Sequence, residues 1–209
     1  MIDLDKLAYD DRSTTIRARC VAAAMAFCKS AATPSLKGVL ITQERGYPEA
    51  RATDSYMGAT VLDVTATPDY STDRPPVFVP LDVLRQMVKA SPKADAWLVV
   101  RDEGGGMRSC ASLDPVEGIG TTATWRDKGY TFPKNFLDLF RLDGVTSTSG
   151  TTTVNSRLLA TACKAAQVAT GDKDVRLDVT MRGTNPTTVT IDGYRDTVEL
   201  DALIMPCMR

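Results

Sequence analysis

Few side chains in this 209-residue sequence could carry out catalysis or hold a metal. Histidine, the commonest general base and metal ligand, is absent. No nucleophile, base or phosphate-binding loop accompanies the best candidate carboxylates, Asp54, Asp63 and Asp69, and Asp54 is expected to shape a turn. The five cysteines are too widely spaced for a zinc site or a disulfide framework. We therefore expect buried, unreactive thiols, and no catalytic residue, metal or cofactor.

Basic side chains are a second group with possible chemistry, because they can bind phosphate. Three segments expected to be helical, 16–31, 81–94 and 156–173, hold nine basic and two acidic residues, although the net charge of the chain is −1. If these helices line one face, that face attracts a DNA backbone without reading its sequence. The alternative is that each helix simply carries solvated charges. The candidate DNA contacts are Arg17, Arg19, Lys29, Arg85, Lys89, Arg157 and Lys164.

The C-terminal stretch "ALIMPCMR", residues 202–209, is a third group, because it ends the chain on soft apolar side chains. Methionine and cysteine adapt to apolar partners of different shapes, and Pro206 can end a strand. The stretch could therefore grip a ligand. The alternative is that Ile204 and Met205 only complete the core of the last strand.

The elements that must position these groups repeat along the chain. Helices are predicted over 15–32, with Ser13 and Thr14 as cap, over 80–91, and over 155–171 between Asn155 and Gly171. Three strands are predicted after each helix, and "DEGGGMR" (102–108) is expected to be a hairpin turn. The predicted strands are 36–43, 49–55, 59–67, 96–102, 106–113, 118–125, 175–182, 186–193 and 197–205.

One structural unit, βαβββ, thus occurs three times, with short leading strands expected at 76–80 and 151–155. Such a unit cannot cover both faces of its sheet alone and needs a neighbour to extend the sheet. The sequence therefore predicts an α+β fold in which antiparallel sheets carry their helices on one face.

Three stretches in this order resemble the bacterial β sliding clamp, the processivity factor of replicative DNA polymerase. "TPSLKGVLI" and "ARATDSYMGATV", within 33–61, are similar to the clamp's Pro-x-Leu-x-Gly-Val-Leu strand and its Ala-Thr-Asp segment. "WRDKGYTFPKN" (125–135) is similar to the Pro-Lys-Asn end of the clamp's middle domain. "ALIMPCMR" is similar to the terminal Val-Val-Met-Pro-Met-Arg-Leu. The resemblance implies the DNA-clamp fold and a non-enzymatic, DNA-associated role.

The resemblance also implies a pocket for short peptide motifs of polymerase or repair proteins. The sequence departs from the family at this pocket: Gly-His-Arg-Leu after Thr-Asp is Ser-Tyr-Met-Gly here, and a cysteine stands in the tail. The matching positions are Leu36, Thr53, Ser55, Tyr56, Met57, Pro133, Met205, Pro206, Cys207 and Met208.

The chain is shorter than the family's three-domain clamps. By the resemblance, residues 1–135 form a full clamp-like domain of two units and residues 136–209 form a half domain of one unit. An unpaired half domain predicts self-association into a dimer or tetramer. The first function we expect is a clamp-like processivity factor; the alternative is a peptide-binding protein that does not encircle DNA and competes for clamp-binding partners.

The acidic N-terminus and the lack of a long apolar run predict a cytoplasmic protein without a membrane partner.

Overall fold

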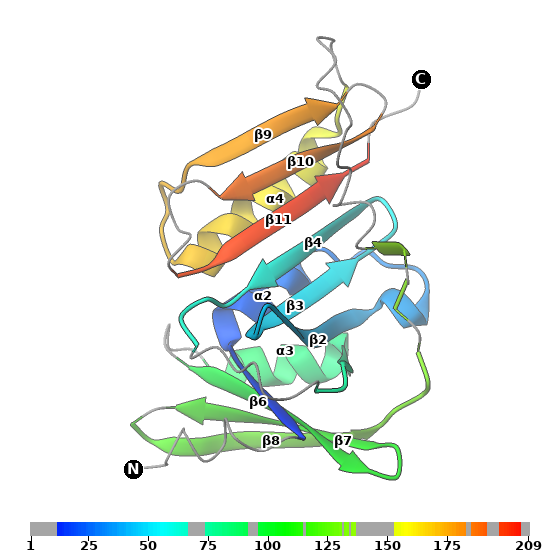
Figure 1. Ribbon diagram of the computed structural model, residues 1–209, viewed down its shortest axis with the longest axis vertical. Helices are drawn as coiled ribbons and strands as arrows, with labels where there is room; N and C mark the ends of the chain where they lie inside the picture. Colours follow the sequence, from blue (N-terminus) through cyan, green and yellow to red (C-terminus); the bar gives the residue numbers. More distant parts are fainter. Residues whose placement is uncertain are drawn as a thin grey trace.

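The computed structural model describes residues 12–66, 74–91, 96–114, 116–130, 132–133, 135–136, 153–182, 185–191 and 197–205 (Figure 1). Within these residues, three α-helices accompany two antiparallel sheets. The elements in chain order are β1 (Ser13–Arg17), α2 (Ala18–Met25), the 3-10 helix η1 (Pro34–Leu36), β2 (Gly38–Glu44), β3 (Tyr47–Thr53), β4 (Met57–Leu62), β5 (Val77–Pro80), α3 (Leu81–Ala90), β6 (Trp97–Gly104), β7 (Met107–Asp114), β8 (Gly118–Arg126), α4 (Ser156–Thr170), β9 (Leu177–Arg182), β10 (Asn185–Ile191) and β11 (Glu199–Ile204).

The two sheets are joined by exchanged strands. The larger sheet has the order β5-β2-β3-β4-β11-β10-β9 and the smaller sheet has the order β1-β6-β7-β8. In the chain, β1 comes just before the strands of the large sheet, but it pairs with β6 in the small sheet. Conversely, β5 comes just before the strands of the small sheet, but it pairs with β2 in the large sheet. β4 pairs with β11 along its whole length, from Leu62–Glu199 to Met57–Ile204. The C-terminal unit therefore continues the same sheet.

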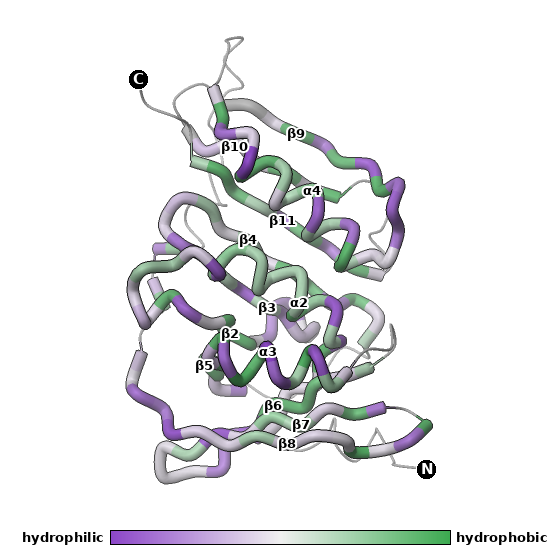
Figure 2. Tube along the Cα trace, turned by 180° about the vertical axis from the view of Figure 1, so that it is seen from behind, coloured by the Kyte–Doolittle hydropathy of each residue, from purple (hydrophilic) through white to green (hydrophobic). Residues whose placement is uncertain are grey.

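All three α-helices lie on one side of the large sheet, as Figures 1 and 2 show from opposite directions. α2 is in the middle, in contact with both α3 and α4. Its small residues allow this close packing: Ala18, Ala23 and Ala24 are buried. α4 faces it with a row of four buried alanines, from Ala162 to Ala169. α2 therefore lies close against both neighbouring helices.

The α+β architecture predicted from the sequence, with antiparallel sheets and helices on one face, is confirmed. The leading strand predicted at 151–155 is wrong for residues 153–155, which form no strand before α4. α3 and α4 form within one residue of the predicted bounds. The Asn155 side chain accepts a hydrogen bond from the Arg157 amide, and Gly171 closes α4 with φ of 77°, as the cap residues predict. The glycines after β6 form the expected hairpin turn, with positive φ at each of Gly104, Gly105 and Gly106.

The helix predicted over 15–32 is wrong at its start. Ser13 and Thr14 are no cap, because residues 13–17 form β1. The β-branched Thr14, Thr15 and Ile16 favour a strand, and pairing with β6 fixes it. This long-range pairing cannot be seen in the local sequence.

The same helix is also predicted too long at its end. α2 stops at Met25, and the chain continues in turns. The amides of Phe27 and Cys28 donate to carbonyls three residues back, at Ala24 and Met25. This tighter spacing redirects the chain toward η1.

Three of the cysteines that the structure describes are buried, as predicted. Cys20, Cys28 and Cys110 are free and buried. Burial raises the pKa of Cys28 and of Cys110 to about 12 and raises the pKa of Cys20 still further. Cys163 is half-buried, and Cys207 lies outside the described residues. Three of the thiols are therefore held protonated and unreactive near neutral pH.

No helix in the described part of the chain is long and apolar enough to cross a membrane.

Candidate functional site

A hollow of about 840 Å³ opens between the turn that joins β3 to β4, the segment after α2 and the first turns of α4. Apolar and cationic side chains stand beside neutral polar ones and Asp54 in its lining. The larger apolar side chains are Tyr56, Met57, Leu158 and Met205. The cationic side chains are Lys29, Arg157 and Lys164.

Asp54 builds the turn that carries the apolar part of the hollow. Its Oδ1 accepts hydrogen bonds from the amides of Tyr56 and Met57, both at 3.0 Å, and its Oδ2 accepts one from the hydroxyl of Ser30. Ser55, at the corner, has φ of 82°, a conformation that few residues other than glycine adopt. The expectation that Asp54 shapes a turn is confirmed, and the turn leaves 69% of Tyr56 exposed.

The turn is also fastened to the last strand. The amide of Met205 donates to the carbonyl of Tyr56 at 2.9 Å, directly beyond the last β4–β11 pair, Met57–Ile204. Met205 is 40% exposed and lines the hollow. Met205 is therefore brought to Tyr56 and Met57, two expected peptide contacts that lie far from it in the sequence.

Four other expected peptide contacts that the structure describes do not line the hollow. Thr53 is buried, and its hydroxyl donates to the Met57 carbonyl at 2.8 Å, which makes it a support for the turn. Leu36 is buried in η1, whereas Ser55 and Pro133 are exposed. Pro206, Cys207 and Met208 lie outside the described residues.

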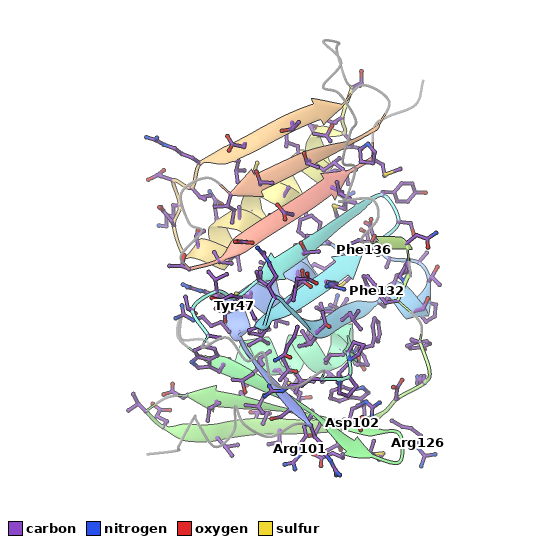
Figure 3. All side chains as sticks on the ribbon, viewed as in Figure 1. Tyr47, Arg101, Asp102, Arg126, Phe132 and Phe136 are labelled. Carbon is purple, nitrogen blue, oxygen red and sulfur yellow. The ribbon has the colours of Figure 1, made fainter. Side chains whose placement is uncertain are left out.

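The sequence analysis did not predict the role of Phe136, which packs against β4. Phe136 is 4% exposed and meets Phe132 edge to face, with ring centroids 5.0 Å apart (Figure 3). Its ring lies so close to Gly58 that a Cβ atom there would collide with it. Glycine inside a strand often marks such a close approach, so Gly58 was the available signal.

Two of the expected DNA contacts are occupied by contacts inside the protein. Arg17 lies in β1, where its amide donates to the buried Asp63 at 3.0 Å and its guanidinium lies 5.4 Å from the ring centroid of Trp97. Arg19 donates to the carbonyl of Thr170 at 3.4 Å, which links α2 to α4. Both are half-buried. Their positions favour a structural role.

The remaining expected DNA contacts are exposed and fall into two groups. Arg85 and Lys89 are one helical turn apart on α3. Lys29, Arg157 and Lys164 gather around the hollow. Lys29 lies beyond the end of α2, so the turns after this helix place it beside α4.

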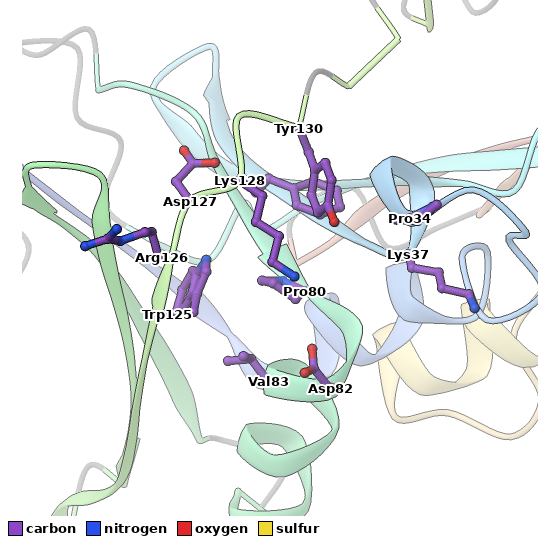
Figure 4. Close-up of a pocket in the computed structure, with 11 residues that line it drawn as sticks. Pro34, Lys37, Pro80, Asp82, Val83, Trp125, Arg126, Asp127, Lys128 and Tyr130 are labelled. Atoms are coloured by element: carbon purple, nitrogen blue, oxygen red, sulfur yellow. The ribbon is translucent and has the colours of Figure 1, made fainter.

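A second concavity, of about 350 Å³, lies between the start of α3 and the segment after β8 (Figure 4). We call it the aromatic groove, because Phe78, Trp125 and Tyr130 line it; the rings of Phe78 and Tyr130 meet edge to face at 5.8 Å. The sequence analysis did not predict it. Its charged lining residues are of both signs: Lys37, Arg126, Lys128, Asp82 and Asp127.

The sequence matches no family model and no curated protein at a significant level. The structure is similar to solved sliding clamps. The clamp of Pseudomonas aeruginosa aligns over 95% of this chain and 67% of its own, with 13% identity and a TM-score of 0.64. The clamp of Bacillus subtilis aligns over 96% and 65%, with 12% identity and a TM-score of 0.63.

An archaeal protein of similar structure aligns with this chain over almost its whole length. PCNA of A. fulgidus, solved with the C-terminal region of FEN-1, aligns over 95% of this chain and 99% of its own, with 9% identity and a TM-score of 0.58. The chain thus spans about two thirds of the bacterial clamps that it matches. These likenesses establish the sliding-clamp fold.

Proposed function

We propose that this chain is a clamp-like, non-enzymatic processivity factor that binds duplex DNA through phosphates and holds partner peptides in the hollow. The fold supports the proposal, because it is that of solved sliding clamps. The observation that carries it is the common side of the large sheet on which α2, α3 and α4 lie (Figure 2), together with the exposed cations on α3 and around α4. A row of such cations attracts a DNA backbone of any sequence.

The salt dependence of duplex binding tests the DNA part of this proposal. Each phosphate contact contributes about −0.9 to the slope of log affinity against log salt. The double variant Arg85→Gln/Lys89→Gln should therefore reduce the magnitude of that slope by about 2, for a 30-base-pair duplex followed by fluorescence anisotropy. The matched control is Arg45→Gln/Arg176→Gln, which removes two exposed cations outside the helices. Equal slopes in both variants would refute a DNA contact at α3.

The hollow favours a second candidate function, a peptide-binding protein that does not encircle DNA. An archaeal clamp of this fold was solved with the C-terminal region of FEN-1, so peptide binding occurs on this architecture. In this chain Tyr56 and Met205 are exposed apolar side chains on the wall of a concave site. High peptide affinity together with duplex binding too weak to show a salt slope would favour this candidate.

We also propose self-association through the outer strands, as the division into a full domain (1–135) and a half domain (136–209) predicts. β8 and β9 end the two sheets, and each has one paired neighbour among the described strands. Unpaired strand edges are ready to join another chain. Light scattering at micromolar concentration should give the mass of a dimer or tetramer, with or without duplex DNA. A stable monomer of 22.6 kDa would refute this part of the proposal.

A further inference from the structure

The charge around the hollow is one-sided. Lys29, Arg157 and Lys164 are exposed, and none of them forms an ion pair with a carboxylate in the described part of the chain. Asp54 is the carboxylate of the lining, but it is buried and both of its oxygens accept hydrogen bonds from the turn and from Ser30. The cations are therefore left to interact with a ligand.

The first turn of α4 adds to this positive potential. α4 has 15 residues and begins at Ser156, so its N-terminal dipole is positive at the hollow. Arg157 and Lys164 are two turns apart on the same side of this helix. They place two cations along one wall, while Lys29 stands on the segment that follows α2.

Two apolar side chains that line the hollow are also exposed to solvent. Tyr56 and Met205 are 69% and 40% exposed, an unusual state for large apolar side chains that face a concavity. Methionine side chains can fit apolar groups of different shapes. A ligand that fills this hollow must therefore offer apolar groups and negative charge within the same short segment.

We propose that the hollow binds an acidic peptide, which places an apolar side chain against Tyr56, Met57 and Met205 and carboxylates against Lys29, Arg157 and Lys164. The inference rests on the peptide-binding part of the proposed function and specifies the chemistry of the partner. Duplex DNA fits less well, because its phosphates would meet the cations but leave the apolar lining uncovered. A cavity of about 840 Å³ is in the range that binds side chains and small ligands.

Three labelled peptides distinguish this chemistry. Each has ten residues and the same central Leu and Phe, and the four flanking residues are all Asp, all Asn or all Lys. With the full chain in 50 mM NaCl, the Asp peptide should bind about tenfold more tightly than the Asn peptide by fluorescence anisotropy, because three exposed charge pairs each contribute modestly. The Lys peptide should bind weakest. The difference between the Asp and Asn peptides should narrow in 200 mM NaCl.

Two sets of variants show which residues produce peptide binding and the preference for the Asp peptide. The triple variant Lys29→Gln/Arg157→Gln/Lys164→Gln should bind the Asp and Asn peptides equally. Tyr56→Ala/Met205→Ala should weaken all three peptides. The matched control removes three exposed cations elsewhere: Arg45→Gln/Arg101→Gln/Arg176→Gln.

The outcomes separate this inference from the function on which it rests. Failure of every peptide to bind would contradict the peptide-binding function itself. Equal binding of the Asp, Asn and Lys peptides would retain that function and overturn the acidic preference. Loss of duplex binding in the Lys29, Arg157 and Lys164 variant, with the peptide preference intact, would assign these cations to DNA and also overturn the inference.

Discussion

The hollow and the aromatic groove both lie where segments of two βαβββ units meet, and both are lined by three cations. In the hollow, the cations stand beside a single carboxylate that is buried and engaged by the turn. In the groove, the carboxylates of Asp82 and Asp127 line the same concavity as the cations (Figure 4). The comparison teaches that the balance of charges, more than the number of cations, distinguishes a site prepared for an acidic ligand.

Two aromatic side chains in the segment after β8 differ in burial. Phe136 is buried against Gly58 on β4, whereas Tyr130 is half-buried and meets Phe78 at the groove. The ring of Phe136 is therefore closely packed on the sheet, and the ring of Tyr130 is partly open to solvent at the groove.

Truncation of these rings should give the largest effect. Phe136→Ala should lower the free energy of unfolding by about 3 kcal/mol, because it leaves a cavity over Gly58. Tyr130→Ala should cost about 1 kcal/mol, because that side chain is only partly buried. Urea denaturation of both variants measures the difference. Equal losses would contradict the contrast between a buried and a marginal ring.

Removal of the carboxylate of Asp54 or Asp127, each of which holds a turn, should also lower the free energy of unfolding, but by a smaller amount. Asp54→Ala removes the acceptor for two amides and for the Ser30 hydroxyl and should cost about 2 kcal/mol. Asp127→Ala removes contacts to Gly129 and Arg108 at a more exposed turn, and should cost less than about 1 kcal/mol. The same denaturation experiment applies. A larger loss for Asp127 would mean that the groove, and not the hollow, has the more ordered wall.

Local signals in the sequence were sufficient for α3, α4 and the three strands that follow each helix. Asn155 and Gly171 bound α4 by their own hydrogen-bonding and conformational preferences. The true start of α2 was not accessible, since β1 is specified by its pairing with β6 across the molecule. A β-branched run can be assigned to a strand only when its partner is known.

The candidate site could be predicted only in part for the same reason. The resemblance to sliding clamps pointed to Tyr56, Met57 and Met205 as one pocket, and the structure brings these three together. The cations of the same hollow were expected as DNA contacts on separate helices. They meet because β4 pairs with β11 and α2 packs on α4, which no local pattern indicates.

Methyl NMR of the methionines, together with the indole signal of Trp125, tests the central claim most directly. Met57 and Met205 lie in the hollow, Met107 lies on β7 away from it, and Trp125 lines the groove. On titration with the Asp peptide, the methyl signals of Met57 and Met205 should shift, while those of Met107 and Trp125 should not. Shifts at Trp125 with none at Met57 and Met205 would place the acidic ligand in the groove and contradict the account.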